Sequence, residues 1–379
     1  MEYWQRRYVE ENRAFVMPAG LVVVDLPNKG LCGGVELAVT ALCNSANPCP
    51  NTWIHDCLEK VEVVVNGSQV VKSLTGSQIL AMNMYDGTYD RQQAPRLYFN
   101  TSHHETFYLN FGRFYHDKQF MLDLGQVNDP ELRITFNFGL GNHHGWLLGA
   151  TFGTADYTVI PHLLRDSMVV PRGYIKSSEA YRFTSVPGLR QNMTLPRGPV
   201  YNGFYLESRY SGQGHGMNMD YVEVNINNGE KIPFRLEQGE FMTEMKRRYG
   251  IFEVTQLMIP GNAGQLAPPL ENCEIFESNY RNSDVIGCSE PAWGGFCTIE
   301  DHLISTYGAG AGNLIRWMHY KGVLPYNLAK VPFLDSMDEA QWLESRDLGD
   351  LWLRYEEAAA AGALATIILL ADEVVTAYL

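Results

Sequence analysis

Two pairs of adjacent histidines are the residues in this sequence best suited to bind a metal ion. His103-His104 is followed by Glu105, and His143-His144 lies further along the chain. Imidazoles and carboxylates are common zinc ligands, but a site needs its ligands on one side of a surface. Adjacent side chains of a strand point to opposite faces, so each pair offers one inward imidazole. We therefore predict structural roles for these histidines and expect no metal ion or other cofactor.

Motifs for nucleophilic catalysis and phosphate binding are absent from the sequence. It contains no Gly-x-Ser-x-Gly, and Gly308 to Gly312 has no following Lys and Ser or Thr, so this segment predicts a flexible loop. The aromatic stretch Tyr201 to Tyr210, with Ser211 to Gly216 after it, could bind a sugar, although such alternation is more typical of a core or a subunit interface. Lys246 to Arg248 favours a solvated helix end, with anion or lipid-headgroup contact as the alternative. We predict that the protein is not an enzyme.

The N-terminal segment combines aromatic and basic residues at helical spacing. Arg6 and Arg7 each precede a glutamate by four residues, and Trp4 and Tyr8 form a short aromatic stripe. The pattern predicts a helix over residues 2 to 13. Trp and Tyr flanked by Arg suit a membrane interface. We predict membrane contact for these four residues, and packing on the same subunit or a neighbour is the alternative.

Length and charge limit the classes of function. The chain has 379 residues, enough for two domains or one large domain. Its 43 acidic residues exceed its 29 Lys and Arg residues, giving a net charge of −14. Nucleic-acid affinity comes mainly from basic groups that neutralise phosphates, so we expect no direct nucleic-acid binding.

The N-terminus has no apolar core of the kind a secretory signal needs, so we expect folding in the cytoplasm. The most apolar stretch, Ala358 to Ala371, is shorter than the roughly 20 residues of a membrane-spanning helix. The seven cysteines match no Cys-x-x-Cys metal pattern. We expect reduced, partly buried thiols rather than a disulfide framework.

Apolar runs of strand length and period two dominate the chain, which predicts a mainly β protein. The runs are Leu21 to Leu26, Val35 to Leu42, Val61 to Val65, Leu132 to Phe138, Tyr157 to Ile160, Tyr221 to Ile226, Ile251 to Ile259 and Leu351 to Tyr355. Helical patterns are sparse. Besides residues 2 to 13, they cover Gln238 to Tyr249 and Met337 to Glu344, the latter after the capping residue Ser336.

An internal repeat indicates two similar domains. Leu58 to Leu80 and Met219 to Met242 each contain a strand starting Val-Glu-Val, an Asn-Gly turn, a returning strand and a second Gly before a helical turn. The two turns are Asn66-Gly67 and Asn228-Gly229, and Asn-Gly between apolar runs is a strong hairpin signal. Leu132 to Ile160 and Leu351 to Leu370 form a second correspondence in the same order. Chance similarity between two β domains is the alternative explanation.

Two tandem β domains of about eight strands each favour jelly rolls, which fold one sheet over another. The stretch His162 to Tyr174, with Pro171 and Gly173 inside it and Pro161 before it, predicts the linker. We therefore predict an N-terminal helix or arm over residues 1–14, a first jelly roll over 15–170 and a second over 171–379.

The sequence resembles the double jelly-roll major capsid proteins of tailless icosahedral viruses, the lineage of tectiviruses, corticoviruses and adenoviruses. Leu58 to Leu80 is similar to the hairpin that follows the first long insertion in such proteins. Phe111 to Asp117, continuing to Leu132-Arg133-Ile134, resembles two strands of phage members. Tyr181 to Thr184 and Leu195 to Gly198 are similar to the start of the second roll. The likeness covers about residues 15 to 379 as short patterns in order.

The resemblance implies a structural function in a virion. Such subunits form homotrimers with a pseudo-hexagonal outline, and these capsomers tile an icosahedral shell, often over an internal membrane. The implied partners are neighbouring capsomers, penton and minor capsid proteins and an internal lipid membrane, with assembly in the host cytoplasm. Trp4, Arg6, Arg7 and Tyr8 would then face the membrane or the shell interior. The alternative is a two-domain jelly-roll enzyme, bicupin-like or carbohydrate-active.

Overall fold

The structure is a computed structural model. It describes residues 1–43, 53–88, 92–93, 96–98, 102–139, 152–209, 219–259, 287–289, 296–304, 313–358 and 366–376. The predictions for His143-His144, Ser211 to Gly216 and Gly308 to Gly312 lie outside these residues.

The first half of the chain forms a β sandwich, called here the first sandwich. The elements of this half are β1 (Tyr3–Arg6), β2 (Glu10–Ala14), β3 (Ala19–Asp25), β4 (Leu31–Cys43), α1 (Ile54–Cys57), β5 (Leu58–Val65), β6 (Gln69–Leu74), α2 (Gly76–Tyr85), β7 (Gln92–Gln93), β8 (Arg96–Tyr98), β9 (Ser102–Asn110), β10 (Leu122–Asp123), β11 (Glu131–Asn137) and β12 (Phe152–Arg165). Of these, β7 and β8 lie outside the sandwich and pair with β18. One sheet has the order β1-β12-β4-β10, with β2 beside β12 and β9 beside β4. The strands β3-β11-β5-β6 form the other.

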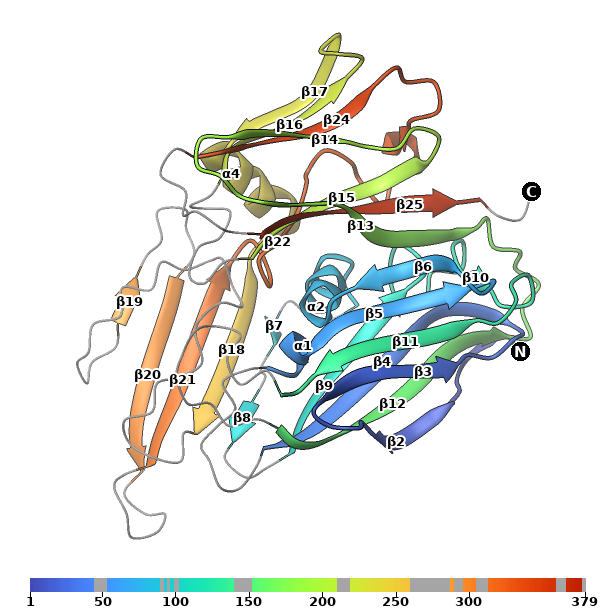
Figure 1. The fold of residues 1–379 in the computed structure, drawn as a ribbon, viewed down its shortest axis with the longest axis vertical. Helices are drawn as coiled ribbons and strands as arrows, with labels where there is room; N and C mark the ends of the chain where they lie inside the picture. The colour runs from blue at the N-terminus through green and yellow to red at the C-terminus, as the bar shows by residue number, and fades with distance from the viewer. Residues whose placement is uncertain are drawn as a thin grey trace.

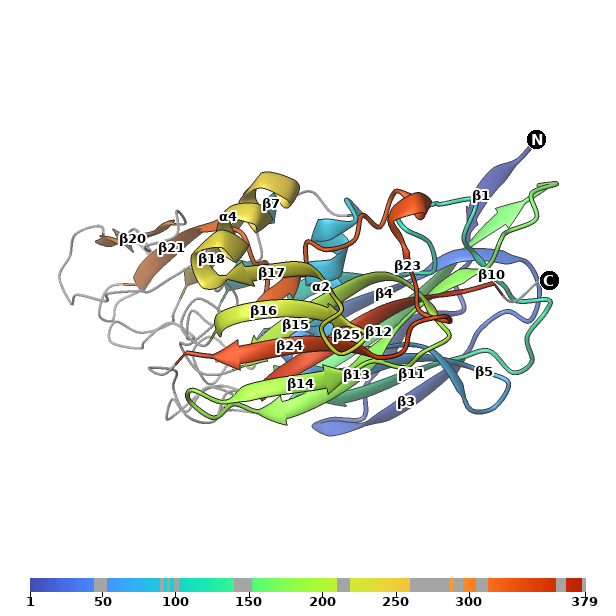
Figure 2. The same cartoon turned by 90° about the horizontal axis from the view of Figure 1, so that it is seen from above.

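The second half forms the second sandwich. The elements of this half are β13 (Tyr174–Thr184), β14 (Arg190–Thr194), β15 (Val200–Arg209), β16 (Met219–Ile226), β17 (Lys231–Glu237), α4 (Gln238–Tyr249), β18 (Phe252–Ile259), β19 (Gly287–Ser289), β20 (Phe296–Ile304), β21 (Asn313–Gly322), β22 (Leu328–Lys330), the 3₁₀ turn η1 (Glu339–Gln341), β23 (Leu343–Glu344), β24 (Leu351–Glu357) and β25 (Thr366–Val375). The sheet β14-β24-β16-β17 faces the strands β13-β25-β15-β22. The sheet of β18 to β21 lies to one side of both sandwiches (Figures 1 and 2).

Alternation along the strands explains why these segments form two-layer sandwiches. In β11, Leu132, Ile134 and Phe136 are buried, while the residues between them are partly exposed. The same pattern recurs in β24, where Leu351, Leu353 and Tyr355 are buried. Side chains of a strand point alternately to its two faces, so each strand presents one apolar face to the facing sheet. All eight predicted apolar runs overlap strands of the structure, which confirms the mainly β prediction.

Both halves use the same strand pairings in the same order along the chain. In the first sandwich β3 pairs with β11, β11 with β5, and β5 with β6, while β4 pairs with β12. In the second, β14 pairs with β24, β24 with β16, and β16 with β17, while β15 pairs with β25. The helices α2 and α4 follow corresponding strands, β6 and β17. This order fits an internal repeat of the whole sandwich.

One strand joins the sandwiches into a continuous sheet. β13 pairs antiparallel with β25 of the second sandwich and parallel with β6 of the first, where Ser177 lies opposite Lys72. Figure 1 shows β13 and β25 between the two sets of strands. The connection from β12 to β13 spans residues 166–173, inside the predicted linker. The pairing of β12 with β4 continues through Pro161 to Leu164. The expectation that Pro161 interrupts the sheet is therefore wrong. The boundary at residue 170 stays a prediction.

The predicted N-terminal helix is wrong. Residues 3–6 and 10–14 are strands along one edge of β12. Between them, the Arg7 amide donates to the Pro161 carbonyl at 3.1 Å and the Val9 amide to the Val159 carbonyl at 3.0 Å. An isolated helix of twelve residues is only marginally stable, whereas the edge of β12 satisfies the same backbone groups.

The other helix predictions had different outcomes. Gln238 to Tyr249 forms α4, as predicted, with basic residues in its last turn. The predicted helix from Met337 to Glu344 is reduced to η1, which is capped by Asp338 rather than Ser336. None of the helices in the described residues is long and apolar enough to span a lipid bilayer.

Candidate functional site

The adjacent histidines of β9 point to opposite sides of their sheet, as predicted. His103 is buried, with its ring 6.2 Å from that of Phe152, and His104 faces outward, with Nδ1 3.0 Å from the Thr40 hydroxyl. Glu105 accepts hydrogen bonds from the backbone and ring of His55. Within the described ranges, no group of three or more His, Cys, Asp or Glu side chains is placed to hold a metal ion.

The two predicted hairpin turns connect adjacent strands. Asn66 (φ 53°) and Gly67 (φ 78°) lie between β5 and β6. Asn228 (φ 55°) and Gly229 (φ 90°) lie between β16 and β17, where Asn227 also has a positive φ. Asn and Gly tolerate these left-handed conformations better than other residues.

The thiol of Cys32 is buried and donates to the Gly34 carbonyl at 3.3 Å. Burial raises its pKa to about 12, so this cysteine is a neutral core residue near pH 7.

Trp4 and Arg6, two of the four predicted N-terminal contact residues, pack against their own chain. The Trp4 ring stacks on His116, with ring centroids 4.1 Å apart. A Cβ at Gly33 would lie 2.8 Å from this indole, so the glycine makes room for the ring. The Arg6 guanidinium donates to both carboxylate oxygens of Glu36 at 2.8 Å.

A buried histidine completes this N-terminal cluster, defined here as Trp4, Arg6, Glu36, His116 and His162. His162 Nε2 donates to Glu36 at 2.9 Å, and its Nδ1 accepts from the hydroxyl of Tyr115 at 2.9 Å. Arg7 and Tyr8, the other two predicted contact residues, are exposed. Trp4 and Arg6 thus have partners within the chain, and contact of the four residues with a membrane or the shell interior stays a prediction.

The N-terminal cluster shifts the protonation equilibria of its own members. Burial opposes ionisation of Glu36, but the hydrogen bond from His162 and the charge of Arg6 outweigh it and lower the pKa of Glu36. Burial, together with the proximity of His162, lowers the pKa of His116 to about 4. At neutral pH the cluster therefore holds an ionised Glu36 and a neutral His116.

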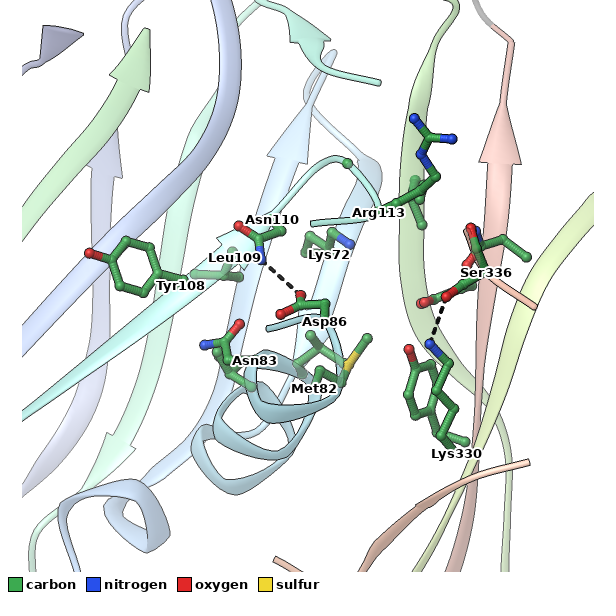
Figure 3. Close-up of a pocket in the computed structure, with 17 residues that line it drawn as sticks. Lys72, Met82, Asn83, Asp86, Tyr108, Leu109, Asn110, Arg113, Lys330 and Ser336 are labelled. Atoms are coloured by element: carbon green, nitrogen blue, oxygen red, sulfur yellow. Dashed lines mark hydrogen bonds between the residues drawn. The ribbon is translucent and has the colours of Figure 1, made fainter. Parts of the chain in front are cut away.

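The junction between the sandwiches contains a second polar cluster, which we call the junction cluster. Figure 3 shows Lys72, Asp86 and Asn110 of the first sandwich facing Lys330 and Ser336 of the second. They line a cavity of about 30 Å³, which has room for one or two water molecules.

Hydrogen bonds connect the junction cluster across the two halves. Lys72 Nζ donates to the Ser177 hydroxyl at 2.7 Å, and Asp372 accepts from the hydroxyls of Ser177 and Tyr205. Within the first half, the Asn110 amide donates to Asp86 at 2.8 Å.

The second half holds its own buried ammonium group at the same cavity. Lys330 Nζ donates to the Ser336 hydroxyl at 2.8 Å and lies 5.5 Å from the centre of the Tyr205 ring. The helix α2 also contacts the second sandwich, since the Tyr85 hydroxyl donates to the Leu328 carbonyl at 2.8 Å.

Burial penalises every charge in the junction cluster. It lowers the pKa of Lys72 to about 8 and also lowers the pKa of Lys330, while it raises the pKa of Asp86 and Asp372. Each shift is opposed by the nearby opposite charges. The charges of the two lysines and the two aspartates therefore balance. Burying them has a desolvation cost that apolar side chains would avoid.

Sequence reasoning missed the junction cluster, although a signal was present. Lys72 follows two valines, Lys330 follows Leu328-Ala329, and Asp372 follows Leu369 to Ala371. A charge that interrupts an apolar strand must either be exposed or find a partner. The sequence alone does not tell which, and for Lys72 the partner Ser177 lies 105 residues away.

Comparison with known proteins relates this arrangement to solved structures. No protein-family model and no curated protein matches the sequence. The major capsid protein of STIV, Sulfolobus Turreted Icosahedral Virus, superposes with a TM-score of 0.58 at 11% identity, covering 100% of this chain and 98% of that one. The major capsid protein P2 of bacteriophage PM2 gives 0.54 at 11% identity, covering 100% and 99%. The chain has the double jelly-roll fold.

A third solved structure extends the comparison. The capsid of PBCV-1 superposes on the double jelly-roll chain with a TM-score of 0.54 at 9% identity, covering 98% of this chain and 93% of that one. The predicted fold of two tandem jelly rolls is confirmed, since each sandwich aligns in order over nearly the whole chain. At these identities the likeness establishes the fold, and it transfers no site residue.

Proposed function

We propose that this double jelly-roll chain is the major structural subunit of a viral capsid. The observation that supports this most is the likeness to three capsid proteins over nearly their full lengths, with both rolls in the same order. The net charge of −14 fits a shell that does not bind the genome directly.

The proposal extends to assembly. Three copies with two similar sandwiches each give a pseudo-hexagonal outline, which can tile a shell in a near-hexagonal layer. Neighbouring capsomers, penton and minor capsid proteins would be the partners in the virion, after assembly in the host cytoplasm. The first and second jelly rolls would span about residues 15–170 and 171–379.

Light scattering and electron microscopy test this function. The purified protein should have three times the chain mass of 42.8 kDa, and its images should show a six-lobed outline. Larger shells in material enriched in the protein would support the capsid role. A stable monomer at high concentration that retains stoichiometric metal would contradict it and favour the jelly-roll enzyme.

Membrane contact is a separate part of the proposal, now restricted to the exposed Arg7 and Tyr8. Flotation of the full protein with anionic vesicles should fall when Arg7→Glu and Tyr8→Ser are combined. The matched control is Arg346→Glu, an equal change of charge at an exposed residue of the second half that lies outside the strands. Equal flotation of both variants and the native protein would remove the N-terminal strands from the membrane contact.

A further inference from the structure

Among the strands of the described residues that pair on one side only, two sets are related by the internal repeat: β17, and the N-terminal strands β1 and β2. β17 ends its sheet and pairs with β16 alone. The N-terminal strands β1 and β2 lie along one edge of β12 and pair with nothing else. Both segments are mostly exposed, and Ile232 of β17 and Tyr8 between β1 and β2 are exposed to 48% and 54%. Unpaired edges carry free backbone donors and acceptors that can add another strand.

The internal repeat relates these two edges to a contact inside the chain. β6 and β17 occupy corresponding positions, since each follows its hairpin turn and precedes a helix. β13 and the N-terminal strands also correspond, since each pairs antiparallel with the last strand of its sandwich, β25 or β12. Within the chain, β6 pairs in parallel with β13. The equivalent edges of β17 and of the N-terminal strands have no such partner within the described residues.

We propose that β17 of one copy docks in parallel on the outer edge of the N-terminal strands of a second copy. This inference rests on the proposed trimer and names the surfaces that form it. Three chains then contain six sandwich-to-sandwich contacts, alternating between β6 with β13 inside a chain and β17 with β1–β2 between chains. A closed ring leaves neither edge unpaired.

We expect the partner to be a second copy of this chain, because the corresponding edges, those of β6 and β13, already pair with each other inside the chain. The contact needs only a short pairing, since β6 and β13 share a single register pair at Lys72 and Ser177. Pro233 removes one backbone donor from β17, and it is compatible with an edge that forms only a short parallel pairing.

The surroundings of the two edges also fit the inference. The junction cluster lies at the contact of β6 with β13, and the N-terminal cluster lies beneath β1. Side-chain hydrogen bonds thus lie at the contact of β6 with β13 and beneath β1. The N-terminal cluster holds β1 on β12, so that the outer edge is presented in a fixed position.

Disulfide cross-linking of the full-length protein tests the inference. Ile232→Cys is combined in turn with Arg7→Cys, Tyr8→Cys or Glu11→Cys, because the register between copies is unknown. The single variants control for the native cysteines. The pair Ile232→Cys with Val170→Cys is the control for random collision, since Val170 is 81% exposed but lies outside the N-terminal strands. Each variant is oxidised and separated without reductant, and its mass is measured by light scattering before oxidation.

Before oxidation, we expect a trimer. After oxidation, at least one variant that pairs Ile232→Cys with a cysteine at position 7, 8 or 11 should form covalent dimers and trimers. Their yield should exceed that of every control at least tenfold. Trimers without such cross-links, or with the same yield as the Val170 pair, would overturn this inference and leave the proposed trimer intact. A monomer before oxidation would overturn the proposed trimer and this inference with it. Cross-linking that joins residues of one chain only would also overturn it.

Discussion

Acid should loosen the N-terminal strands before it unfolds either sandwich. The neutral His116 ring lies between Trp4 and Tyr115, with ring centroids 4.1 and 3.7 Å away. Its pKa is lowered to about 4, because burial and the neighbouring His162 disfavour the imidazolium. When the strand leaves, the ring returns to an ordinary pKa near 6.5 and takes up a proton more readily. The docked state therefore loses stability as the pH falls from 6.5 toward 4, and gains nothing further above 6.5.

The size of the effect follows from the two pKa values. Each pH unit below 6.5 lowers the stability of the docked strand by about 1.4 kcal/mol until the pH approaches the lower pKa. Without solvent screening, the loss between pH 7.5 and pH 5 would be about 2 kcal/mol. His116 is partly exposed, and solvent screens its interactions. We therefore expect about half of that value, about 1 kcal/mol, or about fivefold in the opening equilibrium. Glu36, whose pKa is lowered, adds a loss of stability only below the ordinary glutamate pKa of 4.5, which lies outside this interval.

Hydrogen exchange measured by mass spectrometry reports this opening. The amides of Arg7 and Val9 are bonded to β12, so the protection factor of a peptide covering residues 2–10 should fall about fivefold from pH 7.5 to pH 5. His116→Phe keeps an aromatic ring in the stack but has no proton to gain, so its protection factor should not change with pH. An unchanged native protection factor, or an equal fall in the variant, would refute the reasoning.

Three further predictions concern stability and are read from urea unfolding midpoints. Lys72→Met should lower the unfolding free energy by about 3 kcal/mol, because it removes one of the two cations beside the buried Asp372, and adding Asp372→Leu should restore most of the loss. Gly173→Ala should cost about 2 kcal/mol or more, because a Cβ there would lie 2.0 Å from the Val375 carbonyl oxygen. Phe107→Ala should cost about 3 to 5 kcal/mol, since the ring is fully buried in the first core. A double variant no better than Lys72→Met, or midpoints unchanged by either other substitution, would contradict these assignments.

Most strands could be predicted because the alternation of apolar and polar residues along a strand indicates directly which side chains face the core. In β4, Val35, Leu37 and Val39 are buried and belong to one core, and the predicted run covers all three. The Asn-Gly pairs were equally informative, since the turn needs a positive φ that these residues adopt at low cost. Both signals depend on neighbours in the sequence, so no knowledge of distant contacts was required.

The N-terminal segment shows where this reasoning fails. Arg6 was expected to pair with Glu10 on a helix, and it pairs instead with Glu36 of β4. The spacing of charges was compatible with a helix, but the available edge of β12 decided the outcome. That edge is formed by residues about 160 positions later in the chain, such as Leu164 opposite Trp4, and nothing near Trp4 indicates it.

The junction cluster acts more on the relative position of the two sandwiches than on the stability of the fold. Two similar sandwiches with apolar edges could associate in several relative positions, because apolar contact is not directional. A shift of β13 against β6 would separate Lys72 from Ser177 and Asp372, and it would leave a buried charge without these partners. Such a charge costs several kcal/mol, far more than a misplaced methyl group. The cluster thus disfavours the alternative positions more strongly than it stabilises the observed one, which suits a chain whose two sandwiches must keep a fixed relation.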